Sequence, residues 1–168
     1  MSRVNLFEFE DFGWFPQVLR NHMTSFLEMG HKILRPPAFW IDFLEMVLRH
    51  QNTDLVFDLC SGSGGPLFEI EGIVNKTREH KVKFVLSDLY PNADCLEFIK
   101  KGGKQNFCYL KDPVAAHTVP QGWRGVSTLI AGFHHFPEPE ARAIVKPSGS
   151  MPSRFPFHQL PQTAPPVM

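Results

Sequence analysis

The feature that most constrains this chain is the glycine-rich run DLCSGSGGP at residues 58–66. It follows the apolar residues Leu55, Val56 and Phe57 and precedes a segment with a helical pattern. A short apolar run bounded by glycines is typical of a strand buried in a parallel sheet. Glycines after such a strand let backbone N–H groups approach a ligand, because no Cβ stands in the way. The run therefore predicts a strand, a ligand-binding loop and a helix, with a tight turn that binds nothing as the alternative.

Strand and helix patterns alternate along the middle of the chain. Strands are predicted over 55–60, 82–87, 107–110 and 126–131, and helices over 66–78, from Asn92 to Gly102, and from Pro137 onward. Alternation of this kind predicts an α/β fold with the helices packed on a parallel sheet. We expect a doubly wound, mostly parallel, Rossmann-like sheet with N-terminal helices and an incomplete C-terminal half.

Changes in composition divide the chain into three segments. Residues 1–53 form a predicted helical lid or cap, in which residues 39–48 are apolar almost all round and should be buried on most sides. Residues 54–145 form the predicted Rossmann-like core. Residues 146–168 contain six prolines and no acid, so we expect a disordered tail, because proline removes backbone donors from helices and strands alike.

Charge and apolar patterning exclude several classes of protein. Seventeen basic side chains balance seventeen acidic ones, so no strong field recruits nucleic acid or an anionic membrane. The N-terminal residues include acids where a signal peptide would be apolar, and no apolar run approaches the roughly 18 residues of a membrane span. The three cysteines lack metal-ligand spacing, which predicts reduced thiols and no metal site. We expect a soluble, cytoplasmic protein.

Two further motifs follow later predicted strands. Asp88 comes directly after the second strand, 24 residues beyond Gly64, where a carboxylate binds ribose hydroxyls in such sheets. A turn-capping role for Asp88 is the alternative. The run GFHHFPEPEA ends the fourth strand, beside the expected topological switch point. The dinucleotide fingerprint GxGxxG fits poorly, because its third glycine, counted from Gly62, falls on Leu67.

Together these motifs resemble those of a known enzyme family. VFDLCSGSGGP, FVLSDLYPN and LIAGFHHFPEPEARAI resemble, in order, motifs I, II and IV of class I S-adenosylmethionine-dependent methyltransferases, over about residues 54–145. The usual first motif is Asp/Glu-x-Gly-x-Gly-x-Gly. Its positions here are Asp58, Cys60, Gly62 and Gly64, so Cys60 stands where the first glycine is usual.

The resemblance implies S-adenosylmethionine as the cofactor, with 54–145 as its binding core. It implies that the methionine part lies against the main chain of Cys60, Ser61, Gly62 and Gly64, with Asp58 behind the loop, orienting the amino group.

The resemblance also assigns the other half of the cofactor. Asp88 would accept both ribose hydroxyls, and Leu89 would pack on the adenine face. An Asp after the third strand commonly meets the adenine amino group, but the equivalent position here is Ala115, so that contact would be lost. Asp112, three residues earlier, is the nearest carboxylate.

Methyl transfer requires positioning of the acceptor and, where the acceptor carries a proton, a general base. His134 and His135 lie at the expected edge of the sheet, and histidine titrates in the right range, although simple packing there is the alternative. The methyl acceptor and the catalytic residue are not identifiable from the sequence.

Four predicted strands are fewer than the seven usual in this family. The chain is therefore expected to be a truncated methyltransferase whose fourth strand is an uncovered edge, a site for self-association or for another subunit. A non-catalytic Rossmann-like remnant or interaction protein, with weak or no cofactor binding, is the alternative function. A nicotinamide-dependent oxidoreductase is disfavoured by Leu67.

Overall fold

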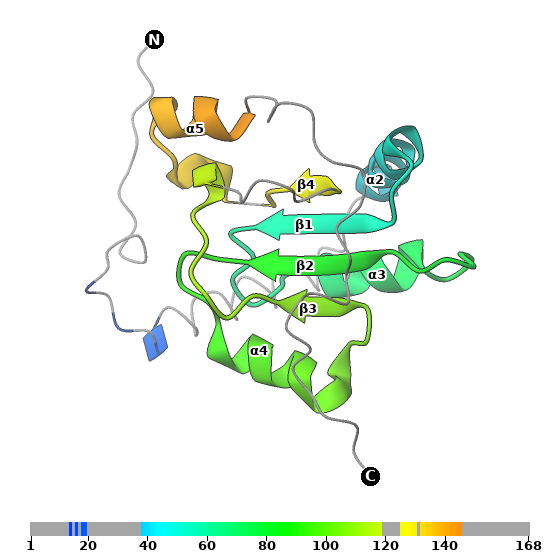
Figure 1. The fold of residues 1–168 in the computed structure, drawn as a ribbon, viewed down its shortest axis with the longest axis horizontal. Helices are drawn as coiled ribbons and strands as arrows, with labels where there is room; N and C mark the ends of the chain where they lie inside the picture. Colours follow the sequence, from blue (N-terminus) through cyan, green and yellow to red (C-terminus); the bar gives the residue numbers. More distant parts are fainter. Residues whose placement is uncertain are drawn as a thin grey trace.

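The computed structural model describes residues 14, 16, 18–19, 38–118, 125–130 and 132–145. Within them the chain forms one all-parallel sheet of four strands, in the order β3-β2-β1-β4, with four α-helices (Figure 1). This confirms the predicted α/β architecture. The predicted tail over 146–168 and most of the predicted lid over 1–53 lie outside the described residues.

The strands lie within the four predicted apolar runs, although β4 ends at Thr128 and the prediction extends it to residue 131. They are β1 (Leu55–Leu59), β2 (Lys83–Ser87), β3 (Phe107–Tyr109) and β4 (Val126–Thr128). Phe57 in β1 is in register with Val85 of β2 on one side and Ser127 of β4 on the other. Among the described strands β4 lies at an edge of the sheet, as predicted; pairing of this edge with a second copy stays a prediction.

The helices begin and end where local signals place them, with one exception. They are α2 (Ala38–Gln51), α3 (Leu67–Val74), α4 (Ala93–Phe98) and α5 (Glu138–Val145). Asn92 caps α4 by accepting the Cys95 N–H, and the chain continues as a π-helical turn, η2 (Ile99–Gly103), in which Gly102 adopts φ 82°. In the described part of the chain, no helix combines the length and apolar character needed to cross a bilayer.

The exception is α3, which was expected to reach residue 78 but ends at Val74. Asn75 stops it by turning its side chain toward β2. The Asn75 amide accepts from Val82 N at 2.8 Å and donates to Val82 O at 2.9 Å. A side chain that satisfies a neighbouring backbone in this way competes with continuation of the helix.

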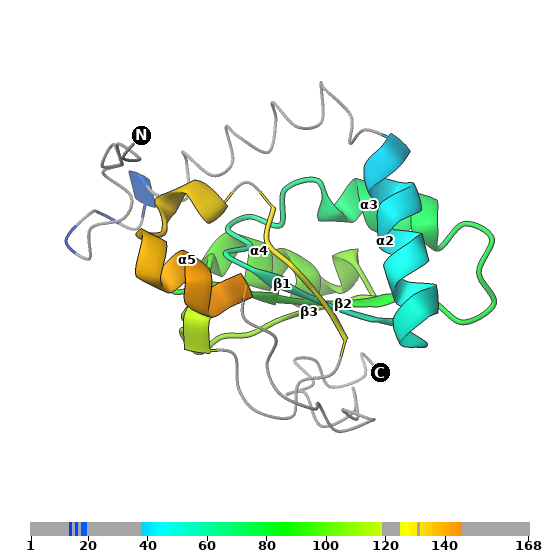
Figure 2. The same cartoon turned by 90° about the horizontal axis from the view of Figure 1, so that it is seen from above.

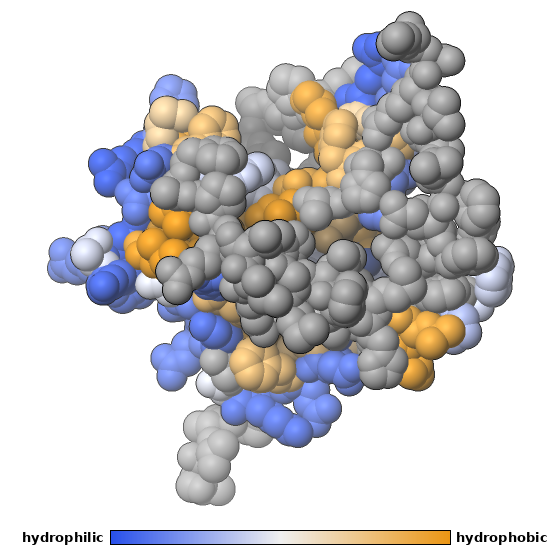
Figure 3. All heavy atoms as spheres, turned by 180° about the vertical axis from the view of Figure 1, so that it is seen from behind, coloured by the Kyte–Doolittle hydropathy of each residue, from blue (hydrophilic) through white to orange (hydrophobic). Residues whose placement is uncertain are grey.

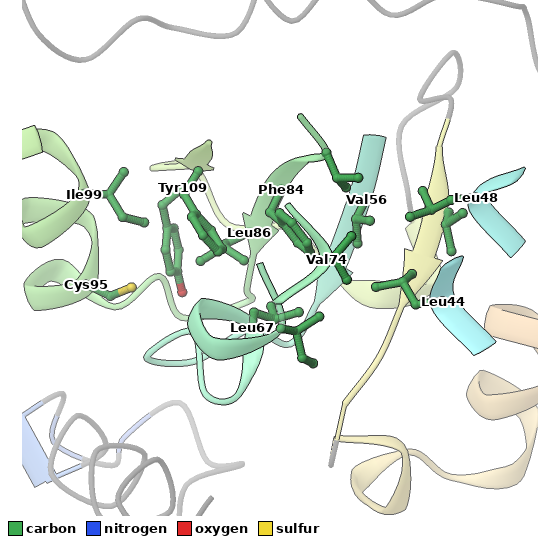
Figure 4. Close-up of a cluster of buried hydrophobic side chains, with 14 residues drawn as sticks. Leu44, Leu48, Val56, Leu67, Val74, Phe84, Leu86, Cys95, Ile99 and Tyr109 are labelled. Carbon is green, nitrogen blue, oxygen red and sulfur yellow. The ribbon is translucent and has the colours of Figure 1, made fainter. Parts of the chain in front are cut away.

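The two faces of the sheet carry alternate residues of each strand. Val56, Phe84 and Leu86 face α2, α3 and α4 in the larger buried cluster (Figure 4). Viewed from above, α3 and α4 lie on the same side of the sheet (Figure 2). Phe57 and Val85 belong to a smaller cluster on the opposite face. This alternation follows from the period of two of a strand, and it buries both faces of the central strands.

The expectation that residues 39–48 are buried on most sides is wrong for the described side chains. In α2, Leu44 and Leu48 enter the core, whereas Phe43 is 54% exposed and Met46 is 57% exposed. Only one side of the helix packs on the core, because a helix with a single neighbouring layer has at least one side left exposed. Several exposed apolar side chains are visible from behind, some of them next to hydrophilic ones (Figure 3).

One buried carboxylate, Glu71 in α3, joins this helix to the residues that precede β3. Its Oε1 accepts from Asn106 Nδ2 at 2.7 Å and from Asn75 Nδ2 at 3.1 Å, and Lys104 Nζ lies 3.6 Å from Oε2. Burial alone would raise the pKa of Glu71, but the two amide donors and the Lys104 charge outweigh it and hold the pKa below its ordinary value.

Candidate functional site

The candidate site lies at the carboxyl ends of β1, β2 and β4. Successive strands from β1 to β3 are added on one side of β1, and β4 lies on its other side, so the topological switch point falls between β1 and β4. Ligands of open α/β sheets bind in the crevice at this position. Asp58, the glycine loop at residues 60–65 and Asp88 all gather here, as the sequence predicts.

The glycine loop adopts a backbone that few residues other than glycine tolerate. Gly62, Gly64 and Gly65 have φ of 52°, 92° and 44°. A Cβ on Gly64 would lie 2.6 Å from the ring of Phe68, so a side chain there would also force that ring to shift. Cys60 has φ 57° and is one of two described non-glycine residues with positive φ. A left-handed backbone of this kind favours glycine, because a Cβ comes too close to the neighbouring carbonyl oxygen. Cys60 therefore adopts a conformation that residues with a side chain seldom take.

Several N–H groups of the loop donate to partners within the protein. Ser61 N donates to Ser87 O at 3.0 Å, and Gly64 N donates to Ser61 O at 2.8 Å. Gly62 N donates to Asp88 Oδ2 at 2.8 Å. The loop after β1 is therefore held against the end of β2, and these three donors are satisfied within the protein.

Asp88 is half-buried and connects the two loops. Its Oδ2 accepts from Gly62 N, and its Oδ1 accepts from Tyr90 N at 2.9 Å. The Tyr90 bond is the turn-capping contact that was the alternative reading of Asp88, and the Gly62 bond brings the carboxylate to the glycine loop. The two roles are compatible in one side chain, and the binding of ribose by Asp88 stays a prediction.

Asp58 is buried beneath the loop, with 2% of its surface exposed. Thr128 Oγ1 donates to Asp58 Oδ1 at 2.7 Å across the β1–β4 pairing, where the two residues are in register. Burial raises the pKa of Asp58 to about 7, and the nearby Asp88 charge adds to the rise, while hydrogen bonds from Thr128 and Ser61 oppose it. The carboxyl group is therefore partly protonated near neutral pH.

Sequence reasoning did not identify Thr128 or Ser87 as part of the site. Ser87 Oγ donates to Asp58 O at 2.9 Å, and Thr128 contacts the Asp58 side chain. Both residues end a strand, and a polar residue at the carboxyl end of a parallel strand is the signal that would have found them.

Leu89 and Ala115 lie in two neighbouring segments beside Asp88. Val114 N donates to Asp88 O at 2.8 Å, which brings the segment carrying Ala115 beside the loop carrying Leu89. Leu89 is exposed and Ala115 is half-buried. Ala115 carries only a methyl group, so its side chain cannot accept a hydrogen bond, and contact of Leu89 or Ala115 with an adenine stays a prediction.

The two histidines follow β4 in a short 3-10 turn, η4 (Phe133–His135). A Cβ on Gly132, the residue before this turn, would lie 3.0 Å from Cys60 Cβ, so the turn starts against the glycine loop. His135 is half-buried. The side chain of His134 lies outside the described residues, so its assignment as a general base stays a prediction.

The comparisons with known proteins leave the family undetermined. No family model matches the chain, and searches of curated proteins and of solved structures found no match. Over the described ranges, no group of three or more His, Cys, Asp or Glu side chains is arranged to hold a metal ion. The class of protein that the structure defines is a small α/β fold with a four-stranded parallel sheet, consistent with a Rossmann-like arrangement.

Proposed function

We propose that this protein is an S-adenosylmethionine-dependent methyltransferase that binds its cofactor at the switch point between β1 and β4. The observation that carries the proposal is the meeting of a carboxylate and a glycine loop at the carboxyl edge of two adjacent parallel strands, with Asp88 Oδ2 2.8 Å from Gly62 N. The methyl acceptor is unassigned.

The chemistry of Asp88 fits a ribose. An ionised carboxylate has about four acceptor positions, and two of them accept Gly62 N and Tyr90 N. A ribose presents two vicinal hydroxyl groups, each of which can donate a hydrogen bond to a carboxylate oxygen. Leu89, exposed next in sequence, supplies an apolar surface for a base.

The loop fits a ligand without phosphates better than a dinucleotide. A pyrophosphate is bound by unoccupied backbone N–H groups of such a loop, and here Ser61, Gly62 and Gly64 donate within the protein. Leu67, at the third glycine position of the dinucleotide fingerprint, is fully buried in the core. Its side chain occupies space that the fingerprint glycine leaves for close packing of the helix on the sheet.

The bound cofactor would supply an electrophilic methyl group. The contribution of the protein would be to bind the ribose through Asp88, to hold the methionine part along residues 60–64, and to orient the acceptor. Asp58 lies beneath that loop with a pKa of about 7. It would face the cationic amino group of the methionine part, directly or through water, and a nearby cation favours the charged form of a carboxylate. His135, and His134 beside it in sequence, are the proposed bases for an acceptor that carries a proton.

A non-catalytic Rossmann-like interaction protein is the second candidate. It is favoured by the same two hydrogen bonds to Asp88, since they satisfy both carboxylate oxygens and close the site on itself without a ligand. Ala115 favours it as well, because a methyl group cannot accept from an adenine amino group.

Calorimetric titration with S-adenosylhomocysteine tests the proposal. We expect the parent protein to bind it and not to bind NAD. The Asp88→Asn variant keeps one side-chain oxygen that can accept from the backbone, but it loses the negative charge. Charge-assisted hydrogen bonds contribute about 1.5–3 kcal/mol each, so the affinity of this variant for S-adenosylhomocysteine should fall at least about tenfold. Glu79→Gln, at an exposed carboxylate before β2 and thus at the opposite edge of the sheet, is the matched control and should bind like the parent. Absence of binding by the parent at millimolar ligand, or equal affinity of Asp88→Asn, would contradict the proposal and favour the second candidate.

A further inference from the structure

Tyr109, the last residue of β3, reaches the glycine loop through the core. It is 4% exposed, and its ring lies among Cys95, Ile99 and Leu86 (Figure 4). Its hydroxyl donates to Gly62 O at 2.8 Å and accepts from Asn92 N at 3.2 Å. A residue outside every motif therefore contacts the loop from a third strand.

The two contacts of Gly62 hold the two peptide groups on either side of its Cα. The N–H that donates to Asp88 belongs to the peptide before Gly62, and the carbonyl that accepts from Tyr109 belongs to the peptide after it. Fixing both peptide planes fixes φ and ψ of Gly62. Glycine is the residue with the most backbone freedom to lose, and this one has φ 52°, so the restraint acts on a residue that could otherwise adopt many conformations.

We propose that Tyr109 is a positioning residue of this site: its hydroxyl orients the peptide after Gly62 and so keeps the Gly62 N–H directed at Asp88, with the carboxylate in place for a ribose. The identity of the ligand rests on the proposed function, whereas the restraint on Gly62 does not. The hydroxyl contacts α4 as well, through Asn92, so the loops after β1 and β2 and the start of α4 are held together at one buried oxygen.

The state of the hydroxyl supports this role. Burial raises the pKa of Tyr109 above its ordinary value, and the charge of Asp88 adds to the effect, so the group keeps its proton and remains a donor throughout the physiological range. A buried hydroxyl without partners would be unfavourable, and here both its donor and its acceptor capacity are used.

The Tyr109→Phe variant tests the role of the hydroxyl alone, because phenylalanine retains the aromatic ring and its packing in the core. Amide hydrogen exchange of Gly62 in the ligand-free protein is the first readout. One hydrogen bond of ordinary strength corresponds to about a fivefold change in an equilibrium, so we expect the Gly62 amide to exchange about five times faster in the variant. Affinity for S-adenosylhomocysteine, the second readout, should fall by a similar factor.

Val74→Ala is the matched control. Val74 is fully buried at the end of α3, so its truncation destabilises the same core cluster without touching the glycine loop. It should leave Gly62 exchange and ligand affinity close to those of the parent under conditions where both variants are folded. A second measurement combines Tyr109→Phe with Asp88→Asn: the effects on Gly62 exchange should be less than additive, because both substitutions release the same residue.

Unchanged Gly62 exchange in Tyr109→Phe, or an equal acceleration in Val74→Ala, would overturn the inference. Failure of the parent to bind S-adenosylhomocysteine would contradict the proposed function instead, and the exchange measurement would still decide whether Tyr109 positions the loop.

Discussion

Replacing Asp58 with asparagine should stabilise the folded protein at about pH 8 and change its stability little at about pH 4. The carboxyl group is buried, and its pKa is about 7 in the folded state against 3.8 for the ordinary group. Between these values the folded protein keeps a proton that the unfolded chain has lost. The free energy of unfolding therefore falls as the pH rises through this range.

The magnitude follows from the difference between the two pKa values. A rise of about three pKa units, at about 1.4 kcal/mol each, makes ionised Asp58 cost as much as about 4 kcal/mol of stability above pH 7. None of this cost applies below the unfolded pKa, where both states are protonated. The asparagine side chain of the Asp58→Asn variant would be neutral at every pH, and its carbonyl oxygen can accept the hydrogen bond that Thr128 Oγ1 now donates to Asp58 Oδ1.

Urea unfolding followed by tryptophan fluorescence, at about pH 4, 6 and 8, measures the effect. The stability of Asp58→Asn relative to the parent should increase steadily with pH, and comparison at each pH cancels the titration of groups common to both proteins. Asp112→Asn, at an exposed carboxylate, should show no such trend. A difference between Asp58→Asn and the parent that is the same at all three pH values would refute the reasoning, since it would mean that Asp58 does not carry a raised pKa in the folded protein.

Two further predictions concern stability. Glu71→Gln should lower the free energy of unfolding by about 1–3 kcal/mol at neutral pH, because the acceptor of the Asn106 and Asn75 hydrogen bonds becomes neutral and the attraction to Lys104 is lost. The loss should shrink on acidification through the lowered folded pKa of Glu71, as measured by urea unfolding at several pH values. A pH-independent loss would argue against a stabilising charge. The Cys60→Gly variant should be more stable than the Cys60→Ala variant by up to about 1 kcal/mol, because the left-handed backbone at φ 57° is sterically unfavourable for a residue with a Cβ. The greater conformational freedom of glycine in the unfolded chain offsets only part of this steric cost. Thermal unfolding of the two variants checks this, and greater stability of the alanine variant would show that the backbone relaxes.

Local signals in the sequence were sufficient for the strands, the glycine loop and most helix ends. The four strands formed within the four apolar runs, Asn92 capped α4, and Gly102 left the helical conformation with φ 82° in the turn after it. These signals act between residues a few positions apart, through hydrophobic periodicity, capping and permitted φ, so they can be read before the fold is known.

The end of α3 and the exposure of α2 could not be read in this way. Asn75 ends its helix because Val82 of the neighbouring chain segment offers it a better set of hydrogen bonds. Phe43 and Met46 are exposed because no described element covers that side of α2, although the sequence around them is apolar. Both outcomes depend on which elements become neighbours.

The sequence by itself determined the order of strands and helices, the position of Asp58 near the end of β1 and that of Asp88 directly after β2. Only the tertiary structure decided what surrounds them. Thr128 meets Asp58 across 70 residues of chain, and Tyr109 meets Gly62 across 47. Such contacts, and the burial that raises the pKa of Asp58, are set by the strand order β3-β2-β1-β4 and its register. The physical reason is that desolvation and long-range hydrogen bonds depend on the packing of the whole sheet, which no local pattern encodes.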